Sequence, residues 1–134
     1  VLSAATLEAA LKIQEEAGID RIREKSLQLT DFLIELVDGF LSDRPYGYSV
    51  ATPREHGRRG GHLAIEHATE AWRICCALKA RGIVPDFRPP SVIRVAPVAL
   101  YNTFSEVWEV ARALKEIIER REYERFPKER SAVS

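Results

Sequence analysis

Arg94 is the residue whose type and position most directly suggest chemistry. It lies in the middle of an otherwise apolar stretch, SVIRVA at 91–96. A charged side chain within an apolar strand needs a partner, because an unpaired buried charge is costly. Arginine carries a planar fork of N–H donors that binds a carboxylate through two parallel hydrogen bonds. The sequence leaves two partners open: a substrate anion, or one of the chain's 20 acidic side chains.

The second candidate is the basic, glycine-rich loop HGRRGGH at 56–62. Backbone N–H groups in such a loop can surround an anion. The spacing does not match the phosphate-binding pattern Gly-x4-Gly-Lys-Ser/Thr, and no lysine follows the glycines. The alternative, which the sequence favours, is a flexible connection between two strands with solvated arginines.

The histidines and cysteines predict no metal site. His56, His62 and His67 follow one another at spacings of six and five residues, which match no compact ligand pattern. Cys75 and Cys76 are adjacent, so they form no ordinary disulfide within the chain. We expect both to act as small core hydrophobes in a reducing, cytoplasmic setting.

These residues need a scaffold, and hydrophobic periodicity predicts an α+β fold in the order α-α-β-β-α-β-β-α. The fold class is a small, largely antiparallel sheet covered on one face by helices. Helices are expected over about 4–17, 20–41, 69–81 and from Thr103, and strands at 48–52, 62–66, 83–87 and 92–96. Strand alternation places Arg94 on the face opposite Ile93 and Val95. Thr103 and Glu106 form the Thr-x-x-Glu pattern of a capping box at the start of the last helix.

The expected organisation has three parts. Residues 1–41 are a helical lead-in, residues 42–120 a small α+β domain, and residues 121–134 a charged, loosely held C-terminal tail. The chain has no methionine and starts at Val1, from which we expect a fragment of a longer protein.

The bulk composition excludes some classes of protein. The 134 residues, 46% of them hydrophobic, suit one compact domain. The formal net charge is zero, which argues against a nucleic-acid partner. No apolar run reaches the roughly 20 residues that span a bilayer, so we expect no membrane partner.

Three segments closely resemble the C-terminal part of the kynureninases. They are RRGGHLAIEH at 58–67, RGIVPDFRPPSVIRVAPVALYNTF at 81–104 and VWEV at 107–110. Residues 1–30 resemble the segment in which these enzymes pass from their large to their small domain, so the resemblance covers essentially the whole chain. It implies the small domain of a pyridoxal-phosphate (PLP) enzyme with the aspartate-aminotransferase-like fold.

Enzymes of this family are cytoplasmic homodimers that hydrolyse L-kynurenine or 3-hydroxykynurenine. The products are anthranilate or 3-hydroxyanthranilate, and L-alanine, in the tryptophan catabolism that leads to NAD biosynthesis. The family's arginine in the IRVAP strand binds the substrate α-carboxylate, and the matching residue is Arg94. The cofactor lysine and phosphate-binding residues belong to the large domain. The resemblance therefore implies that this chain alone is inactive, holds no catalytic or cofactor-binding residue and binds PLP weakly.

Two alternatives remain open. The chain is otherwise the small domain of another PLP-dependent enzyme of the same fold, cysteine desulfurase-like or aminotransferase-like. From a different class, it is a non-catalytic module that binds an anion or a protein through the loop at 56–62.

Overall fold

The computed structural model describes residues 2–128, with side chains from Leu7 onward, and it contains four α-helices and one four-stranded sheet. The elements are α1 (Leu2–Ala17), α2 (Ile19–Phe40), β1 (Tyr48–Val50), β2 (Leu63–His67), α3 (Ala71–Ala80), β3 (Asp86–Arg88), β4 (Val92–Val95) and α4 (Phe104–Glu119), with short 3-10 helices at His56–Arg58 and Glu122–Arg125. The predicted order is confirmed. The third strand begins later than expected, at Asp86, because Gly82 to Pro85 form the connection from α3. No helix in this range is long and apolar enough to cross a membrane.

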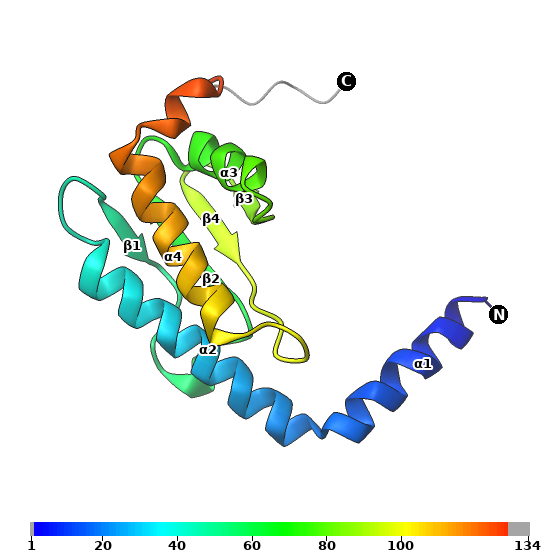
Figure 1. Cartoon of the computed structure of the whole chain (residues 1–134). Helices are drawn as coiled ribbons and strands as arrows, with labels where there is room; N and C mark the ends of the chain where they lie inside the picture. The colour runs from blue at the N-terminus through cyan, green and yellow to red at the C-terminus, as the bar shows by residue number, and fades with distance from the viewer. Residues whose placement is uncertain (1, 129–134) are drawn as a thin grey trace.

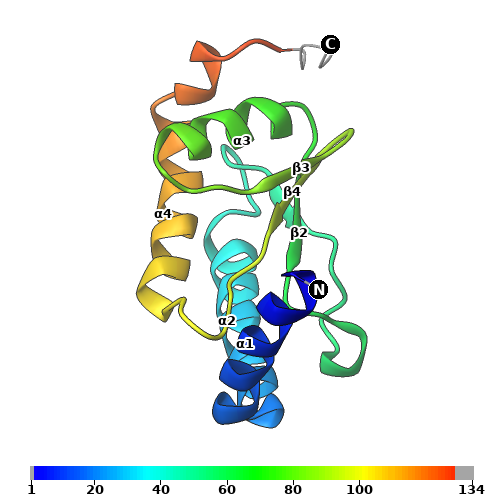
Figure 2. The same cartoon turned by 90° about the vertical axis from the view of Figure 1, so that its right-hand side faces the viewer.

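The sheet is antiparallel throughout, with strand order β1-β2-β4-β3. Helices α2, α3 and α4 cover one of its faces, and no helix of the described residues covers the other, open face (Figures 1 and 2). The central strand β4 pairs with β2 on one side and with β3 on the other. Arg94 therefore lies directly between Ala64 and Asp86 in the register. The predicted fold class is confirmed, and the register decides which side chains surround Arg94.

A single apolar core lies between the sheet and its three covering helices. Every strand turns alternate residues toward this core, and the helices turn their apolar stripes toward it, as their periodicity predicts. Its fully buried members include Leu29, Leu33, Val37, Leu63, Ile65, Ile74, Leu78, Ile93, Leu114 and Ile117. Because α2 supplies several of them, it belongs to the same packed body as the sheet. The division into lead-in, domain and tail stays a prediction.

Tyr48 is the largest of the fully buried side chains and carries the one polar group that β1 sends into the core. Its hydroxyl donates to the backbone carbonyl of Leu114 on α4 at 3.0 Å. Its ring packs edge-on against His67, with ring centroids 5.3 Å apart. Burial raises the pKa of Tyr48 far above its ordinary value, so the group stays neutral and serves as a donor. The hydrogen bond fixes α4 to the first strand.

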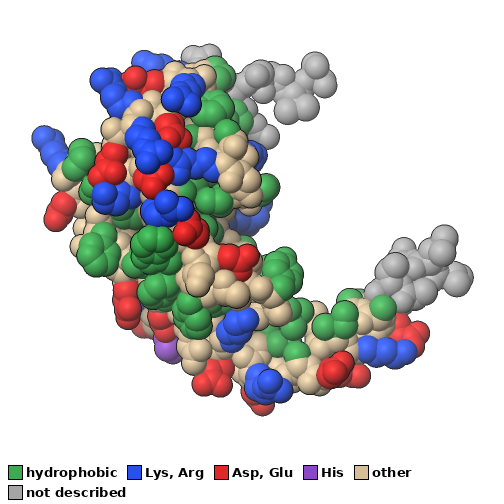
Figure 3. Space-filling view, in the orientation of Figure 1, with side chains coloured by type: hydrophobic (Ala, Val, Ile, Leu, Met, Phe, Trp, Pro, Cys, Tyr) green, Lys and Arg blue, Asp and Glu red, His purple; other side chains and the backbone are tan. Residues whose placement is uncertain are grey.

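Helix α1 stands apart from this body (Figure 1). Gly18, at φ 82°, makes the break between α1 and α2, in a conformation that favours glycine. Leu7, Leu11 and Ile13 are largely exposed on α1, and Figure 3 shows apolar side chains along it. The described residues therefore leave about half of each of these apolar side chains uncovered.

The start of α4 is determined by the predicted capping box. The Thr103 hydroxyl accepts from the backbone N–H of Glu106, and the Glu106 carboxylate accepts from the N–H of Thr103 at 2.7 Å. Just before it, the Asn102 side chain accepts from the backbone N–H of Val98 at 2.8 Å. These bonds define the turn that carries the chain from β4 into α4.

The charged segment after α4 is packed, not loose. Arg81, directly after α3, donates to both carboxylate oxygens of Glu122, at 2.9 and 2.7 Å. Arg73 donates to the carbonyl of Phe126 at 2.9 Å and lies over the ring of Tyr123. The expectation of a loosely held tail is therefore wrong for residues 122–126, because Arg81 pairs with Glu122 and Arg73 on α3 binds the carbonyl of Phe126. Residues 129–134 lie outside the described residues.

Replacing Tyr48 by Phe tests the link between β1 and α4. Loss of one buried hydrogen bond should lower the free energy of unfolding by about 1 kcal/mol. Urea denaturation of the 134-residue chain measures this. Tyr101→Phe is the matched control: this side chain is 70% exposed, so its stability should not change measurably. Equal effects of the two substitutions would contradict the assignment.

Candidate functional site

Arg94 points to the open face of the sheet. Its neighbours Ile93 and Val95 turn toward the helices, Ile93 being fully buried and Val95 packed against the core. The Arg94 side chain is 37% exposed on the opposite face. The predicted alternation is thus confirmed. The guanidinium is reachable from solvent and the strand that carries it is fixed by the core.

Asp86 is the partner that the sequence left open. In the β3–β4 register it lies directly opposite Arg94. Nη2 of Arg94 donates to Oδ2 of Asp86 at 2.5 Å. Nε of Arg88, two residues along β3, donates to the same oxygen at 2.7 Å. Asp86 therefore joins two arginines on the open face of the sheet.

The Asp86 carboxylate remains ionised in this setting. Desolvation alone would raise its pKa, but the hydrogen bond and charge of Arg88, followed by the charge and hydrogen bond of Arg94, outweigh that effect. Together they hold the pKa of Asp86 below its usual range. The pair is a charge-assisted contact, although solvent screens it on an exposed face.

Ion pairs hold the loop around residues 56–62 against α2. The Arg59 side chain is fully buried, forms an ion pair with Asp31 and donates to the carbonyl of Arg54 at 3.0 Å. His56 contacts the other oxygen of Asp31 at 2.8 Å. Arg54 binds both carboxylate oxygens of Asp38 at 2.8 Å. The expectation of a flexible loop with solvated arginines is wrong for Arg59, because two carboxylates of α2 hold this part of the chain, whereas Arg58 is exposed as expected.

This loop is a weak candidate for an anion site for the same reason. The guanidinium of Arg59 already has a carboxylate partner in a buried position. Arg58 is exposed and faces Glu55 at 3.8 Å. The contacts that hold the loop to α2 were missed from the sequence because Asp31 and Asp38 lie on a helix that is distant from the loop along the chain. Their spacing of seven residues, which puts both on one helix face, is the signal that was available.

The histidines and cysteines hold no further site in the described part of the chain. No group of three or more potential metal ligands comes together there. Cys75 is buried in the core, as predicted, and burial raises the pKa of its thiol to about 12. Cys76 is partly buried, and both thiols are free. A thiol with a raised pKa is a poor nucleophile.

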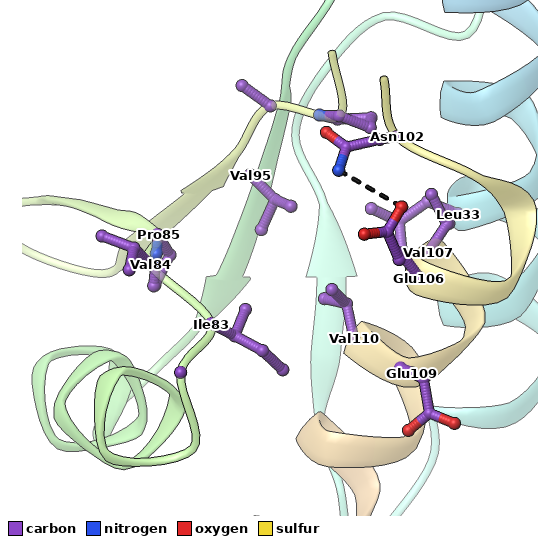
Figure 4. Close-up of a pocket in the computed structure, with 13 residues that line it drawn as sticks. Leu33, Ile83, Val84, Pro85, Val95, Asn102, Glu106, Val107, Glu109 and Val110 are labelled. Atoms are coloured by element: carbon purple, nitrogen blue, oxygen red, sulfur yellow. Dashed lines mark hydrogen bonds between the residues drawn. The ribbon is translucent and has the colours of Figure 1, made fainter. Parts of the chain in front are cut away.

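A cavity of about 330 Å³ opens on the helix side of β4 (Figure 4). Ile83, Val95 and Val110 form its apolar walls, and Glu106 and Glu109 are its ionisable lining groups. Two carboxylates disfavour an anionic ligand. Arg94 does not line this cavity, since it points to the other face of the sheet. The structure therefore separates the cavity from the predicted carboxylate site.

Comparison with known proteins identifies the family. The model of the kynureninase C-terminal domain matches residues 22–114. The chain belongs to the kynureninase family. Kynureninases of Bacillus anthracis, Shouchella clausii and Geobacillus thermodenitrificans are 51%, 50% and 46% identical to it over all 134 residues. The chain spans about a third of the length of these relatives (31%, 30% and 31%).

Membership of the kynureninase family implies a PLP-dependent enzyme, and the described side chains do not fit that cofactor. A lysine that forms a Schiff base needs a neutral amine in a pocket. Lys12 and Lys115 instead pair with Glu8 and Glu119 on helix surfaces, and the hydrogen bond to Glu119 raises the pKa of Lys115. No lysine lines the cavity of Figure 4.

Replacing Asp31 by Ala should destabilise the chain more than replacing Asp38. Without Asp31, the buried Arg59 guanidinium loses its carboxylate, which should cost about 3 kcal/mol of unfolding free energy. Asp38→Ala breaks a half-exposed pair with Arg54 and should cost less than about 1 kcal/mol. Urea denaturation measures both. A larger effect at Asp38 would refute the role of Asp31 as the anchor of the loop.

The pKa of Asp86 should reflect the two arginines that contact its carboxylate. Its pKa should lie below the ordinary value for Asp, about 3.9. Any stability that it contributes is therefore present at neutral pH and lost as the pH falls through the folded-state pKa. Arg88→Gln and Arg94→Gln should each raise this pKa, because each removes a hydrogen bond and a positive charge from the carboxylate. Carbon-detected NMR of the carboxylate measures it, and an unchanged pKa in both variants would contradict the described geometry.

Proposed function

We propose that this chain is the C-terminal part of an enzyme that hydrolyses L-kynurenine or 3-hydroxykynurenine. The products are anthranilate or 3-hydroxyanthranilate, and L-alanine. Arg94 binds the α-carboxylate of the substrate. The observation that carries the proposal is the position of Arg94. It lies on the open sheet face, partly exposed, within the IRVAP segment of a chain 46–51% identical to kynureninases.

The chemistry of the guanidinium supports a carboxylate ligand. Arginine stays protonated at all physiological pH values and matches the geometry of a carboxylate with two parallel donors. Arg94 lies on strand β4, which is paired with a neighbouring strand on both sides, so the position of its Cα atom is fixed. A rigid strand that carries a charged fork suits the binding and orientation of a small anionic substrate.

The part of Arg94 in catalysis is positional. PLP held by the rest of the enzyme would supply the electron sink for cleavage of the bond between the β-carbon and the aryl carbonyl carbon of the substrate. Arg94 holds the carboxylate of the substrate and thereby restricts the orientation of the α-carbon and its bonds. The cofactor lysine is proposed to lie in the rest of the protein, so this chain alone is inactive.

The proposal extends to the setting of the enzyme. We infer a cytoplasmic homodimer that acts on a small molecule and has no nucleic-acid or membrane partner. The zero net charge and the family membership support this. The rival reading of a stand-alone anion-binding module loses support, since the loop that would bind the anion has its buried arginine paired to Asp31.

Arg94→Ala in the full-length enzyme should raise KM for kynurenine roughly ten- to hundredfold, the equivalent of a lost charge-assisted bidentate contact. The absorbance of bound PLP should not change. Arg94→Lys should also be impaired, since an ammonium group cannot form the two parallel bonds. Anthranilate fluorescence measures the rates.

Arg112→Ala is the matched control, because Arg112 is a partly exposed arginine on α4, paired with Glu109. Its KM should equal that of the unmodified enzyme. An unchanged KM for Arg94→Ala would refute the proposed role of Arg94.

A further inference from the structure

We propose that Asp86 is the positioning residue for Arg94: it fixes the guanidinium through one hydrogen bond and leaves one two-donor edge free for the substrate carboxylate. This inference rests on the proposed function of Arg94. It assigns to Asp86 a role that depends on the geometry of the β3–β4 pair.

The backbone places Asp86 where it can do this. Asp86 and Arg94 are directly opposite in the antiparallel register, so their side chains leave the sheet on the same face. Phe87, the next residue on β3, turns inward and packs against the core, with its ring 5.4 Å from that of Trp72. The carboxylate is therefore carried by a strand that the core holds in place.

The contact with Asp86 uses only one of the N–H donors of Arg94. A guanidinium has five N–H groups, which form two edges that each bind a carboxylate in bidentate fashion. Nη2 takes part in both edges and carries two hydrogens. The contact with Asp86 is a single bond from Nη2 to one oxygen. Whichever hydrogen it uses, the other edge keeps both of its donors, so the substrate does not need to displace Asp86.

The other groups around Arg94 do not compete for it. Ala64, directly opposite on β2, offers only a methyl group. Glu66, the nearest carboxylate on β2, lies opposite Val92, and Arg94 forms an ion pair with Asp86 alone among the described residues. Arg88 donates to the same Asp86 oxygen from the other side. The carboxylate of Asp86 is thus held between two guanidinium groups and stays ionised.

Loss of Asp86 should release Arg94 into several rotamers, and substrate binding must then order that side chain again. The cost of ordering one long side chain corresponds to an increase in KM of roughly two- to tenfold. The turnover number should change by less than about twofold, because Asp86 is proposed to act through the binding of the carboxylate and not on the reacting bond. A lower KM would mean that Asp86 competes with the substrate, and would overturn the proposal.

A double-mutant cycle in the full-length enzyme tests the coupling between the two residues. Asp86→Ala, Arg94→Ala and the double variant are compared for KM and kcat. If Asp86 acts through Arg94, Asp86→Ala should raise KM on its own and add nothing in the Arg94→Ala background. Asp86→Asn keeps an acceptor oxygen and should recover part of the loss. Additive effects of the two Ala substitutions would refute the positioning role.

The same set of variants separates the two proposals. If Arg94→Ala leaves KM unchanged, the proposed function fails. If Arg94→Ala raises KM and Asp86→Ala does not, only the role of Asp86 fails. Asp38→Ala is the matched control, since it removes a comparably exposed Asp–Arg pair on α2. Its KM should stay at the value of the unmodified enzyme.

A second readout needs no cofactor. NMR relaxation of the Arg94 Nε–H group in the 134-residue chain, whose core is complete within α2–α4 and the sheet, measures the order of the side chain directly. The group should be ordered in the unmodified chain and in Asp38→Ala, and mobile in Asp86→Ala. Equal mobility in all three proteins would overturn the proposal.

Discussion

The structure depends on the alternation of side chains in a sheet that has one covered face. Each strand must turn its apolar residues toward α2, α3 and α4, because the core on that side has to exclude water. On β4 this requirement buries Ile93 and half-buries Val95. Arg94, which lies between these two residues, must therefore point to the open face of the sheet. The same constraint acts on β3, where Phe87 goes inward and Asp86 and Arg88 go outward. A requirement of packing thus creates the charged cluster on the open face.

Two arginine–aspartate pairs in this chain show that burial decides what such a pair does. Arg59 is fully buried and pairs with Asp31, so its guanidinium is shielded from solvent and anchors a loop to α2. Arg94 is partly exposed, and its contact with Asp86 is a single hydrogen bond. Its side chain is 37% exposed and keeps donors that no described residue binds. Residue type alone does not distinguish these arginines, since both have an aspartate as partner. Exposure and the number of donors in use distinguish them.

Sequence patterns predicted most of the scaffold and part of the site. The helical stripes, the strand alternation at Arg94 and the capping box at Thr103 are local, and all three are confirmed. The expectations that failed involve charges whose partners are distant in sequence. Arg59 looked solvated, and Glu122 looked like part of a loose tail, because Asp31 and Arg81 lie 28 and 41 residues away. Local pattern does not show which distant charge each of these residues pairs with.

By itself the sequence determined that this chain is an α+β domain of the kynureninase family and that Arg94 is its most suggestive residue. Periodicity of hydrophobic side chains and short motifs are properties of neighbouring residues, so they can be read without a fold. Only the tertiary structure decided that Asp86 is the partner of Arg94 and that Ala64 lies on its other side. The register between strands sets these neighbours. It results from the packing of the whole sheet against its helices, and one chain segment cannot specify it alone.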